Sequence, residues 1–282
     1  MINPPQLHRR ESSLPLDRRH FPRSHPHNVR HNSLRLPNWR GKKMVAGPEG
    51  DNLIGTRRDD LIIGGAGDDR LLGGRGNDVI KGAGGQDALF GGPGNDLLYG
   101  GPGYDILRGG RGRDQIMGGS GPDILLGGAG GDRLHGEGGD DILEGGPGND
   151  LLDGGRGSDG YVFGMGDGHD IVINEAQRPA DIDRVILRQG IQRGQVWFRR
   201  TGVDLEMILL GCNASMTMRD WYASTPHRVD RFELANGRSI TSDRIDALVD
   251  AMAVFDPVAN SPTSVPIELA RELKPLLAQS WR

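Results

Sequence analysis

An aspartate recurs at every ninth residue through the middle of the chain, and no other pattern in the sequence carries as much chemistry. Eleven carboxylates keep this spacing without a slip, and two earlier ones, Asp51 and Asp60, share their phase. Carboxylate oxygens are hard ligands, which suit a hard cation such as Ca²⁺. The spacing therefore indicates cation binding. The eleven regular aspartates are Asp69, Asp78, Asp87, Asp96, Asp105, Asp114, Asp123, Asp132, Asp141, Asp150 and Asp159.

The residues around each aspartate predict a turn followed by a very short strand. The repeated phrase is Gly-Gly-x-Gly-x-Asp-x-(Leu/Ile)-x. Its glycines permit positive φ angles and close backbone approach, which favours a turn. In the three residues that follow the aspartate, the middle side chain points to one face and its two neighbours to the other. We therefore expect the eighth position to face inward, and its residues are Leu53, Ile62, Leu71, Ile80, Leu89, Leu98, Leu107, Ile116, Leu125, Leu134, Leu143, Leu152 and Tyr161.

Two copies of the phrase can form one coil, which returns above its start by one strand spacing of about 4.8 Å. The turns then stack in two columns, with Asp69 next to Asp87 in one and Asp78 next to Asp96 in the other. Carboxylates stacked about 5 Å apart repel each other by roughly 1–3 kcal/mol per pair. A cation between the turns removes this repulsion. Calcium takes about six to eight oxygen ligands, so one turn offers too few and two stacked turns can fill the shell.

The predicted ligands are therefore the eleven regular aspartates together with backbone carbonyl groups of the turns. The glycines that open the turns are the expected carbonyl donors, and they are Gly64, Gly73, Gly91, Gly100, Gly109, Gly118, Gly127, Gly145 and Gly154. A flexible glycine-rich linker would not keep aspartate and leucine in phase, and collagen needs glycine at every third residue. A calcium-free solenoid stays open as an alternative, although its turns have little use for an aspartate each time.

The repeat resembles the RTX (repeats-in-toxin) family over roughly residues 46–162. In that family, glycine-rich nonapeptides form calcium-filled parallel β-rolls in proteins exported by bacterial type I secretion. The resemblance implies an all-β fold: a right-handed calcium-filled parallel β-roll (β-solenoid) over residues 44–162, followed by a small β-rich C-terminal domain with one or two helices. Ala83 and Glu137 replace the second glycine of their copies, and the two leading copies lack most glycines, so we expect weaker calcium sites there.

Residues 1–43 contain six prolines, five histidines and ten Lys or Arg residues without apolar periodicity, which predicts a disordered basic arm. Such an arm can bind nucleic acid or an anionic membrane, and its histidines can bind metal. The segment can also be an over-extended gene prediction, with Met44 as the true start. Of these alternatives, we do not expect nucleic acid to be the protein's partner.

Residues 163–240 are expected to form a β-rich capping domain, because short strand-like segments replace the repeat. They resemble the domain that follows RTX repeats in many such proteins. Asp167 and Asp170 either ligate a last calcium or form a polar turn that closes the open end of the solenoid. The predicted strands cover residues 184–187, 195–198, 204–210, 215–218 and 228–234.

A helix is expected over residues 241–255, with Thr241 or Ser242 as its N-cap and apolar residues at helical spacing. Residues 256–282 form a linker and a C-terminal tail. The RTX resemblance implies an uncleaved C-terminal export signal, so this tail is the candidate. A short helix that docks on the body of the protein is the alternative.

No catalytic motif accompanies the repeat, since the sequence has no zinc-protease His-Glu-x-x-His, P-loop, EF-hand loop or Gly-x-Ser-x-Gly elbow. Cys212 stands alone, so an intramolecular disulfide is excluded. We predict a non-enzyme: a secreted, extracellular calcium-binding RTX protein whose roll folds on extracellular calcium and whose partners are several Ca²⁺ ions and the type I secretion machinery. An adhesive or partner-binding surface protein, and an accessory part or fragment of an RTX toxin or enzyme, are the alternatives.

The outward positions beside the Asp69 column predict an apolar face, which seldom stays in water without a purpose. We expect the C-terminal β domain, the last helix or a partner to cover it, with contact to a membrane or cell surface and the oligomeric state both left open. The alternative is an open sheet face that only satisfies strand propensity. The residues of this face are Leu72, Ala88, Phe90, Ile106, Ile124, Leu126 and Ile142.

Overall fold

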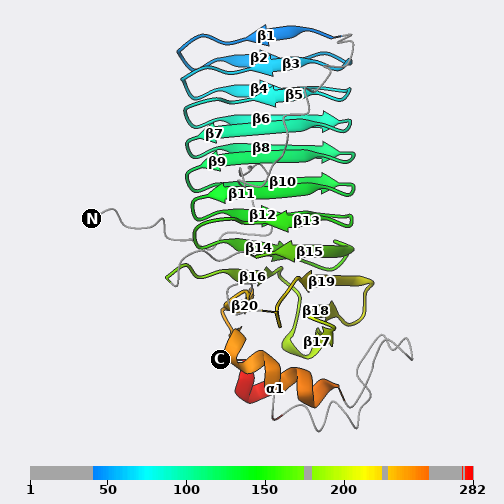
Figure 1. Cartoon of the computed structure of the whole chain (residues 1–282). Coiled ribbons are helices and arrows are strands. Elements are labelled where there is room, and N and C mark those ends of the chain that lie inside the picture. Colours follow the sequence, from blue (N-terminus) through cyan, green and yellow to red (C-terminus); the bar gives the residue numbers. More distant parts are fainter. Residues whose placement is uncertain (1–40, 175–179, 224–227, 254–274, 276, 282) are drawn as a thin grey trace.

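The computed structural model describes residues 41–174, 180–223, 228–253, 275 and 277–281. These residues are nearly all β, and their strands form a parallel β-solenoid whose chain passes back and forth between two sheets (Figure 1). The predicted all-β parallel roll is therefore confirmed.

The first sheet has 11 strands and contains the odd-numbered strands of the solenoid. In spatial order they are β1 (Lys43–Val45), β3 (Leu61–Ile63), β5 (Val79–Lys81), β7 (Leu97–Pro102), β9 (Gln115–Ser120), β11 (Arg133–Gly138), β13 (Leu151–Asp153), β15 (His169–Ile173), β19 (Ala214–Met218), β18 (Asp204–Leu209) and β17 (Val196–Thr201).

The second sheet has 10 strands and contains the even-numbered strands of the solenoid. In spatial order they are β2 (Asn52–Ile54), β4 (Arg70–Leu72), β6 (Ala88–Pro93), β8 (Ile106–Arg111), β10 (Ile124–Ala129), β12 (Ile142–Glu144), β14 (Gly160–Phe163), β16 (Arg184–Leu187), β20 (Arg231–Leu234) and β21 (Ser239–Thr241).

Strand pairing confirms that two repeats make one coil. Leu71 pairs with Leu89 in the second sheet, and Ile80 pairs with Leu98 in the first, always in parallel register. The turns that lead from the first sheet to the second carry Asp69 and its equivalents, and they are called the Asp69 column below. The turns that lead back carry Asp78 and its equivalents, and they are called the Asp78 column.

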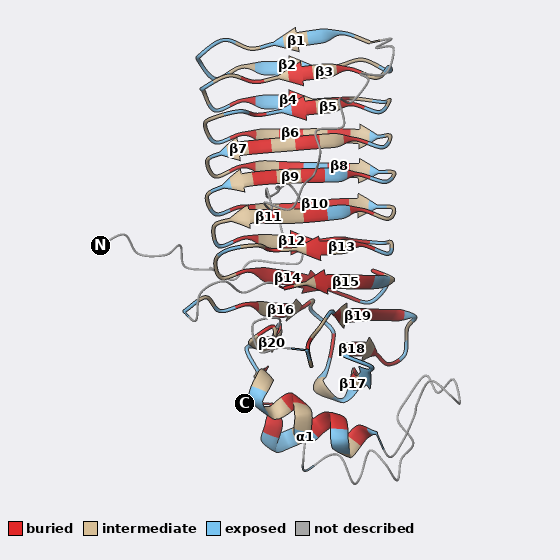
Figure 2. Ribbon diagram, viewed as in Figure 1, coloured by how far each residue is buried: buried red, intermediate tan, exposed pale blue. Residues whose placement is uncertain are grey.

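The core lies between the two sheets and consists of the eighth-position side chains. From Ile62 to Tyr161 each of them is 0% exposed, and they appear as red bands inside the ribbon in Figure 2. Full burial of one such side chain is worth about 1.5–3 kcal/mol. Leu53, in the weak leading copy, is only partly buried, so the roll is less well packed at its entry end.

The C-terminal segment extends the end of the solenoid. β15 and β16 stack on β13 and β14 in parallel, and β17, β18 and β19 then form an antiparallel ribbon. Helix α1 (Ser242–Met252) packs against β17, with Ile245 and Leu248 fully buried. The rings of Phe198 and Phe232 meet edge to face at 5.1 Å between centroids, which joins the two sheets at this end.

The described part of the C-terminal segment continues the stack and leaves most of the outer face of the second sheet open. At its C-terminal end Leu126 is 7% exposed, and Arg188 donates to the neighbouring Glu144. Of the predicted covers, the described C-terminal strands do not lie along this face, and cover by the last helix or by a partner stays a prediction. Phe90 is partly exposed, and the Arg70 guanidinium lies 4.7 Å from its ring centroid. Residues 254–274, which include the start of the predicted last helix, lie outside the described residues.

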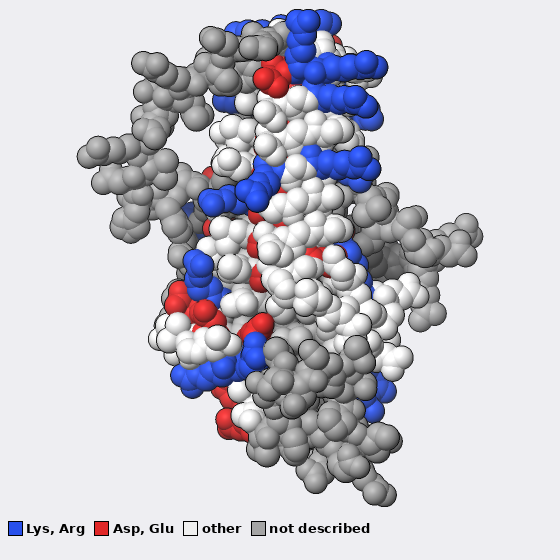
Figure 3. All heavy atoms as spheres, turned by 90° about the vertical axis from the view of Figure 1, so that its right-hand side faces the viewer, with Lys and Arg blue, Asp and Glu red and all other residues white. Residues whose placement is uncertain are grey.

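The first sheet also presents apolar side chains outward, among them Leu61, Val79 and Leu97. The two faces therefore differ less than the sequence pattern predicted. Figure 3 shows one side of the molecule, on which Lys and Arg side chains stand out over the turns at the top of the view.

Candidate metal centres

The repeated aspartates are buried in the turns. From Asp60 to Asp159 every aspartate of the nine-residue series is between 0% and 2% exposed, whereas Asp51 is only partly buried. Aspartate is seldom fully buried in proteins unless a partner compensates its charge. The turns therefore hold carboxylates where water cannot solvate them.

Within each column the turns are linked by a ladder of hydrogen bonds. From Asp51 to Asp141, the backbone N–H of each aspartate donates to Oδ1 of the aspartate eighteen residues further on. Asp87 donates to Asp105 at 2.7 Å in the Asp69 column, and Asp96 donates to Asp114 at 2.7 Å in the Asp78 column. The structure thus brings the predicted aspartates together in two rows.

The second carboxylate oxygen, Oδ2, is buried without a hydrogen-bond partner in most of these aspartates. In the leading turns it does have one, because Oδ2 of Asp69 accepts the N–H of Gly65 at 2.7 Å and Oδ2 of Asp51 accepts that of Gly47 at 2.9 Å. A buried, unpartnered carboxylate oxygen is costly unless a cation compensates it. Among the described residues of the series, the unpartnered Oδ2 atoms belong to Asp78, Asp87, Asp96, Asp105, Asp114, Asp132, Asp141, Asp150 and Asp159.

The first glycine of each turn creates the space beside this oxygen. A Cβ atom on Gly73 would lie 2.3 Å from Oδ2 of Asp78 and 2.8 Å from the carbonyl oxygen of Gly91 in the next turn. The two oxygens converge where no side chain can fit. Hard oxygens from two neighbouring turns around a side-chain-free space are the donor set that calcium takes.

The atoms that an ideal Cβ would meet also show where the glycines predicted as carbonyl donors lie. For most of them the carbonyl oxygen faces the opening glycine of the preceding turn, and these are Gly73, Gly91, Gly100, Gly109, Gly118, Gly145 and Gly154. Gly64 and Gly127 lie beside the carboxylate of their own turn. The ideal Cβ of Gly64 would be 2.3 Å from Oδ2 of Asp69, and that of Gly127 would be 2.5 Å from Oδ2 of Asp132.

Gly82 also presents its carbonyl oxygen to the preceding turn, 2.3 Å from the ideal Cβ of Gly64. It was not among the predicted donors because Ala83 breaks the double glycine that follows. Ala83 itself takes a positive φ of 87° and Glu137 one of 67°, so both keep the glycine-like turn. The signal that could have identified Gly82 is its position five residues before Asp87, which every opening glycine shares.

Burial raises the pKa of the column carboxylates in the metal-free protein. The pKa of Asp105 rises to about 7, and that of Asp114 to about 8, although the N–H bond from the preceding turn lowers both. At Asp141, burial and the neighbouring carboxylates of Asp159 and Asp123 together raise the pKa to about 10. A divalent cation beside these groups would favour their charged form.

Within the described residues, no group of three or more His, Cys, Asp or Glu side chains is arranged to hold a metal ion. This agrees with a site built from two turns, in which each turn supplies one carboxylate and carbonyl groups supply further oxygens. The residues present fit calcium, and they offer none of the nitrogen or sulfur ligands that zinc prefers.

Residues 45–80, 67–98, 90–125 and 126–161 match the model of the RTX calcium-binding nonapeptide repeat, in four copies. Fold and site together define a calcium-binding β-roll. Residues 45–161 thus consist of repeats of the RTX calcium-binding nonapeptide type, and repeats of this type bind Ca²⁺.

The two candidates beyond the repeat have different surroundings. Asp170 joins the Asp78 column, because its Oδ1 accepts the N–H of Asp150 at 3.0 Å. Asp167 instead accepts hydrogen bonds from the N–H of Gly164 at 2.8 Å and from Arg188 at 2.8 Å. Asp167 thus belongs to the turn that closes the column.

Asp183 was missed as a candidate, although its Oδ1 accepts the N–H of Asp159 at 2.8 Å and continues the Asp69 column. A longer insertion separates it from the repeat and breaks the spacing of nine. The local signal was present, because Asp183 is followed by Arg184, the buried Val185 and Ile186, which repeats the Asp-x-apolar-x order of the repeat.

Proposed function

We propose that this protein is secreted and that its roll folds when the chain meets extracellular calcium. The observation that carries the proposal is the set of buried, unpartnered Oδ2 atoms in both columns, among them those of Asp78, Asp105 and Asp159. Without a cation, the folded roll has to protonate these carboxylates or bury their charge. With calcium between the turns, the same oxygens become ligands.

Calcium concentration then decides where the protein folds. Extracellular calcium modules bind with dissociation constants of roughly 10⁻⁴–10⁻³ M, so such sites are empty in a cytosol and filled outside. An unfolded chain can pass through a type I secretion channel, and a calcium-loaded roll is too wide to do so. Within the described residues, no helix is both long and apolar enough to cross a membrane.

Circular dichroism and hydrodynamic radius, measured in chelator and in millimolar calcium, test the folding step. We expect a disordered, expanded chain in chelator and a compact β spectrum with calcium. Magnesium at the same concentration is the control and should not substitute, because it demands near-octahedral geometry and loses its waters reluctantly. A complete β spectrum in chelator at neutral pH would refute the calcium-dependent fold.

The C-terminal tail, residues 256–282, is proposed as the export signal, and the RTX resemblance supports this assignment. Deleting it should stop export from a bacterial host with a type I system, while the purified protein keeps its calcium-dependent folding. Export of the truncated chain at the parent level would contradict the assignment. The proposed role is structural and binding rather than catalytic.

A partner-binding surface is the second candidate function, because the outer face of the second sheet exposes part of its apolar side chains. Ile106, Ile124 and Ile142 lie side by side on this face, each partly exposed, on three neighbouring strands. A partner would cover them. Lysine substitutions at Ile106 and Ile124 test whether a partner covers this face.

A further inference from the structure

The aspartate columns continue for one turn beyond the nonapeptide repeats. Asp170 follows Asp150 after 20 residues instead of 18, and Asp183 follows Asp159 after 24. Both nevertheless accept the same backbone hydrogen bond that links the turns of the roll, at 3.0 Å and 2.8 Å. The longer spacing does not break the ladder.

The strands after these aspartates keep the register of the roll. Ile171 pairs with Leu151 in the first sheet, and Arg184 pairs with Gly160 in the second. Asp170 and Asp183 are each 1% exposed, as deeply buried as the aspartates of the repeats. The two turns therefore occupy the positions that a further repeat would take.

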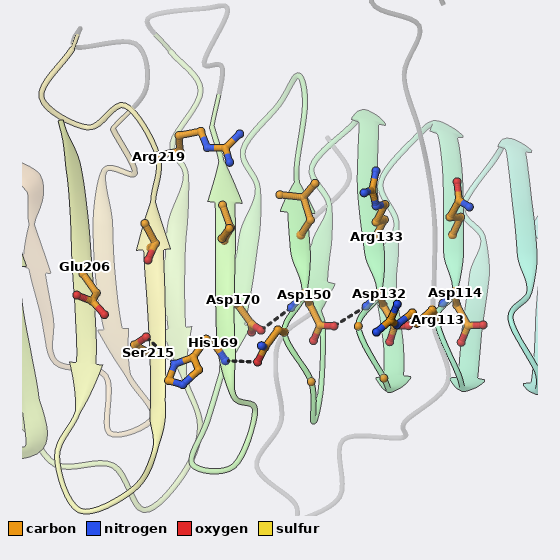
Figure 4. Close-up of a pocket in the computed structure, with 18 residues that line it drawn as sticks. Arg113, Asp114, Asp132, Arg133, Asp150, His169, Asp170, Glu206, Ser215 and Arg219 are labelled. Carbon is orange, nitrogen blue, oxygen red and sulfur yellow. Dashed lines mark hydrogen bonds between the residues drawn. The ribbon is translucent and has the colours of Figure 1, made fainter. Parts of the chain in front are cut away.

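The last aspartate of each repeat column has an unsatisfied oxygen beside the opening glycine of its turn, Gly145 for Asp150 and Gly154 for Asp159. Oδ2 of Asp150 and Oδ2 of Asp159 are buried without a hydrogen-bond partner, and their residues are 2% and 0% exposed. Oδ2 of Asp170 is unpartnered as well. Figure 4 shows Asp114, Asp132, Asp150 and Asp170 in one row, with Asp170 at its end.

On the Asp69 side, the column ends at a protein amide rather than at an open oxygen. The side-chain amide of Asn174 donates to Oδ2 of Asp183 at 3.0 Å and to the carbonyl of Arg228 at 3.2 Å. Its oxygen accepts the hydroxyl of Tyr161 at 3.1 Å. The outer oxygen of Asp183, unlike that of Asp159, therefore has a donor.

On the Asp78 side, a guanidinium group closes the column. Arg188 donates to Asp167 at 2.8 Å and to Glu144 at 2.5 Å. An ideal Cβ on Gly164 would lie 2.7 Å from Cδ of Arg188, so the arginine fills the space that stays open beside the first glycine of a regular turn. The positively charged guanidinium of Arg188 thus occupies the last position of the Asp78 column.

We propose that Asp170 and Asp183 ligate two further calcium ions, the first with Asp150 and the second with Asp159, outside the residues that the repeat family matches. Arg188 and Asn174 end the two columns without metal. The proposal rests on the proposed calcium binding of the repeats, and it adds one ion to each column.

Counting bound calcium by native mass spectrometry at saturating calcium tests the proposal. Asp170→Asn and Asp183→Asn keep an acceptor for the ladder and remove the charge, so each should bind one ion fewer than the parent. Asp230→Asn is the matched control. Asp230 also accepts a ladder bond, from Asp183 at 2.9 Å, but the neighbouring Oδ2 of Asp183 already has its donor, so the count should stay unchanged.

Asp123→Asn separates this inference from the proposed function, because Asp123 lies between two turns of the roll and its loss should lower the count. If Asp123→Asn loses calcium while Asp170→Asn and Asp183→Asn keep the full complement, the two further sites are wrong and the roll still binds calcium. If all three keep it, the proposed function is wrong as well. A variant that does not fold in saturating calcium is replaced by the serine variant, whose hydroxyl keeps an acceptor without the charge, and the same count decides.

Discussion

One aspartate side chain in the middle of the roll connects three turns. Oδ1 of Asp105 accepts the N–H of Asp87, and the N–H of Asp105 donates to Asp123, both at 2.7 Å. Its Oδ2 has no hydrogen-bond partner and lies 2.7 Å from the ideal Cβ of Gly100. Changing this one residue therefore alters the sites on both sides of its turn.

Central aspartates should matter more for calcium binding than leading ones. Asp123→Ala removes a buried carboxylate between two neighbours, so we expect its calcium midpoint for folding to rise several-fold. Asp51→Ala is the control, because Asp51 is partly exposed and its Oδ2 already accepts the N–H of Gly47. Calcium titrations followed by circular dichroism measure both. Equal midpoints for the two variants would contradict the stacked columns.

The metal-free roll should be more stable in acid than at neutral pH. Burial raises the pKa of Asp105 to about 7 and that of Asp123 to about 8, against about 3.9 in an unfolded chain. An acid whose folded pKa is raised stabilises the fold fully below the unfolded pKa, and this stability is lost as pH rises through the folded pKa.

Circular dichroism in chelator should therefore show a β-rich fold near pH 4 that is lost as the pH rises to about 8. In saturating calcium the sign should reverse, because the ion binds the deprotonated carboxylates and protons compete with it. Metal-free protein that is as stable at pH 8 as at pH 5 would show that the column carboxylates are not buried in this way.

At the scale of the element, the turns depend on positive φ angles that side chains resist. Ala83 adopts φ 87° where the repeat normally has glycine, and it sits beside Gly101, whose ideal Cβ would lie 1.9 Å from the Ala83 carbonyl oxygen. A residue with a Cβ loses roughly 1–2 kcal/mol in the left-handed region. The neighbouring turn stabilises this conformation, because the N–H of Ala83 donates to the carbonyl of Gly100 at 2.9 Å.

Ala83→Gly should therefore stabilise the calcium-loaded roll by about 1 kcal/mol. Ala88→Gly is the matched control, because Ala88 lies in strand β6 and glycine in a strand lowers stability by roughly 0.5–1 kcal/mol. Urea unfolding midpoints in saturating calcium give both values. Destabilisation by Ala83→Gly would mean that the turn is not strained.

The partly exposed isoleucines on the outer face of the second sheet allow a test of whether another molecule packs there. Ile106 and Ile124 pair on neighbouring strands, both partly exposed. If a partner or a second copy covers this face, placing lysine at both positions should weaken association and lower the oligomeric state measured by light scattering. The same double change at Gln115 and Arg133, on the other sheet, is the control. Unchanged folding, solubility and oligomeric state would show that nothing packs on Ile106 and Ile124.

Much of the roll could be predicted from the sequence, because its period fixes which side chains face inward and which turns stack. The strand at Arg184–Leu187 has the predicted bounds, since its alternation is local. β15 was not predicted, because the glycines from Gly164 to Gly168 pointed to a turn alone. Asp183 was not predicted because its partner Asp159 lies 24 residues away, a separation that the nine-residue period does not give.

At the scale of the whole molecule, the two sheets grow by adding turns along one axis, and every pair of neighbouring turns makes the same contacts. Such a stack needs ends that differ from its middle, because an exposed coil end invites pairing with other chains. The C-terminal end has them: the antiparallel ribbon of β17, β18 and β19, and helix α1 packed on β17. These elements end the stack in place of a further parallel turn.

The register of eighteen residues makes the length of the roll adjustable. Since each nonapeptide advances the chain by half a coil, removing or duplicating any whole number of them leaves a continuous stack, whereas any other number breaks it. Removing or adding two nonapeptides leaves every remaining strand in its own sheet, so each outer face keeps its side chains. Removing or adding a single one moves all strands on its N-terminal side into the opposite sheet. The roll can thus change length by whole nonapeptides, and its two outer faces keep their side-chain pattern only when the number of nonapeptides added or removed is even.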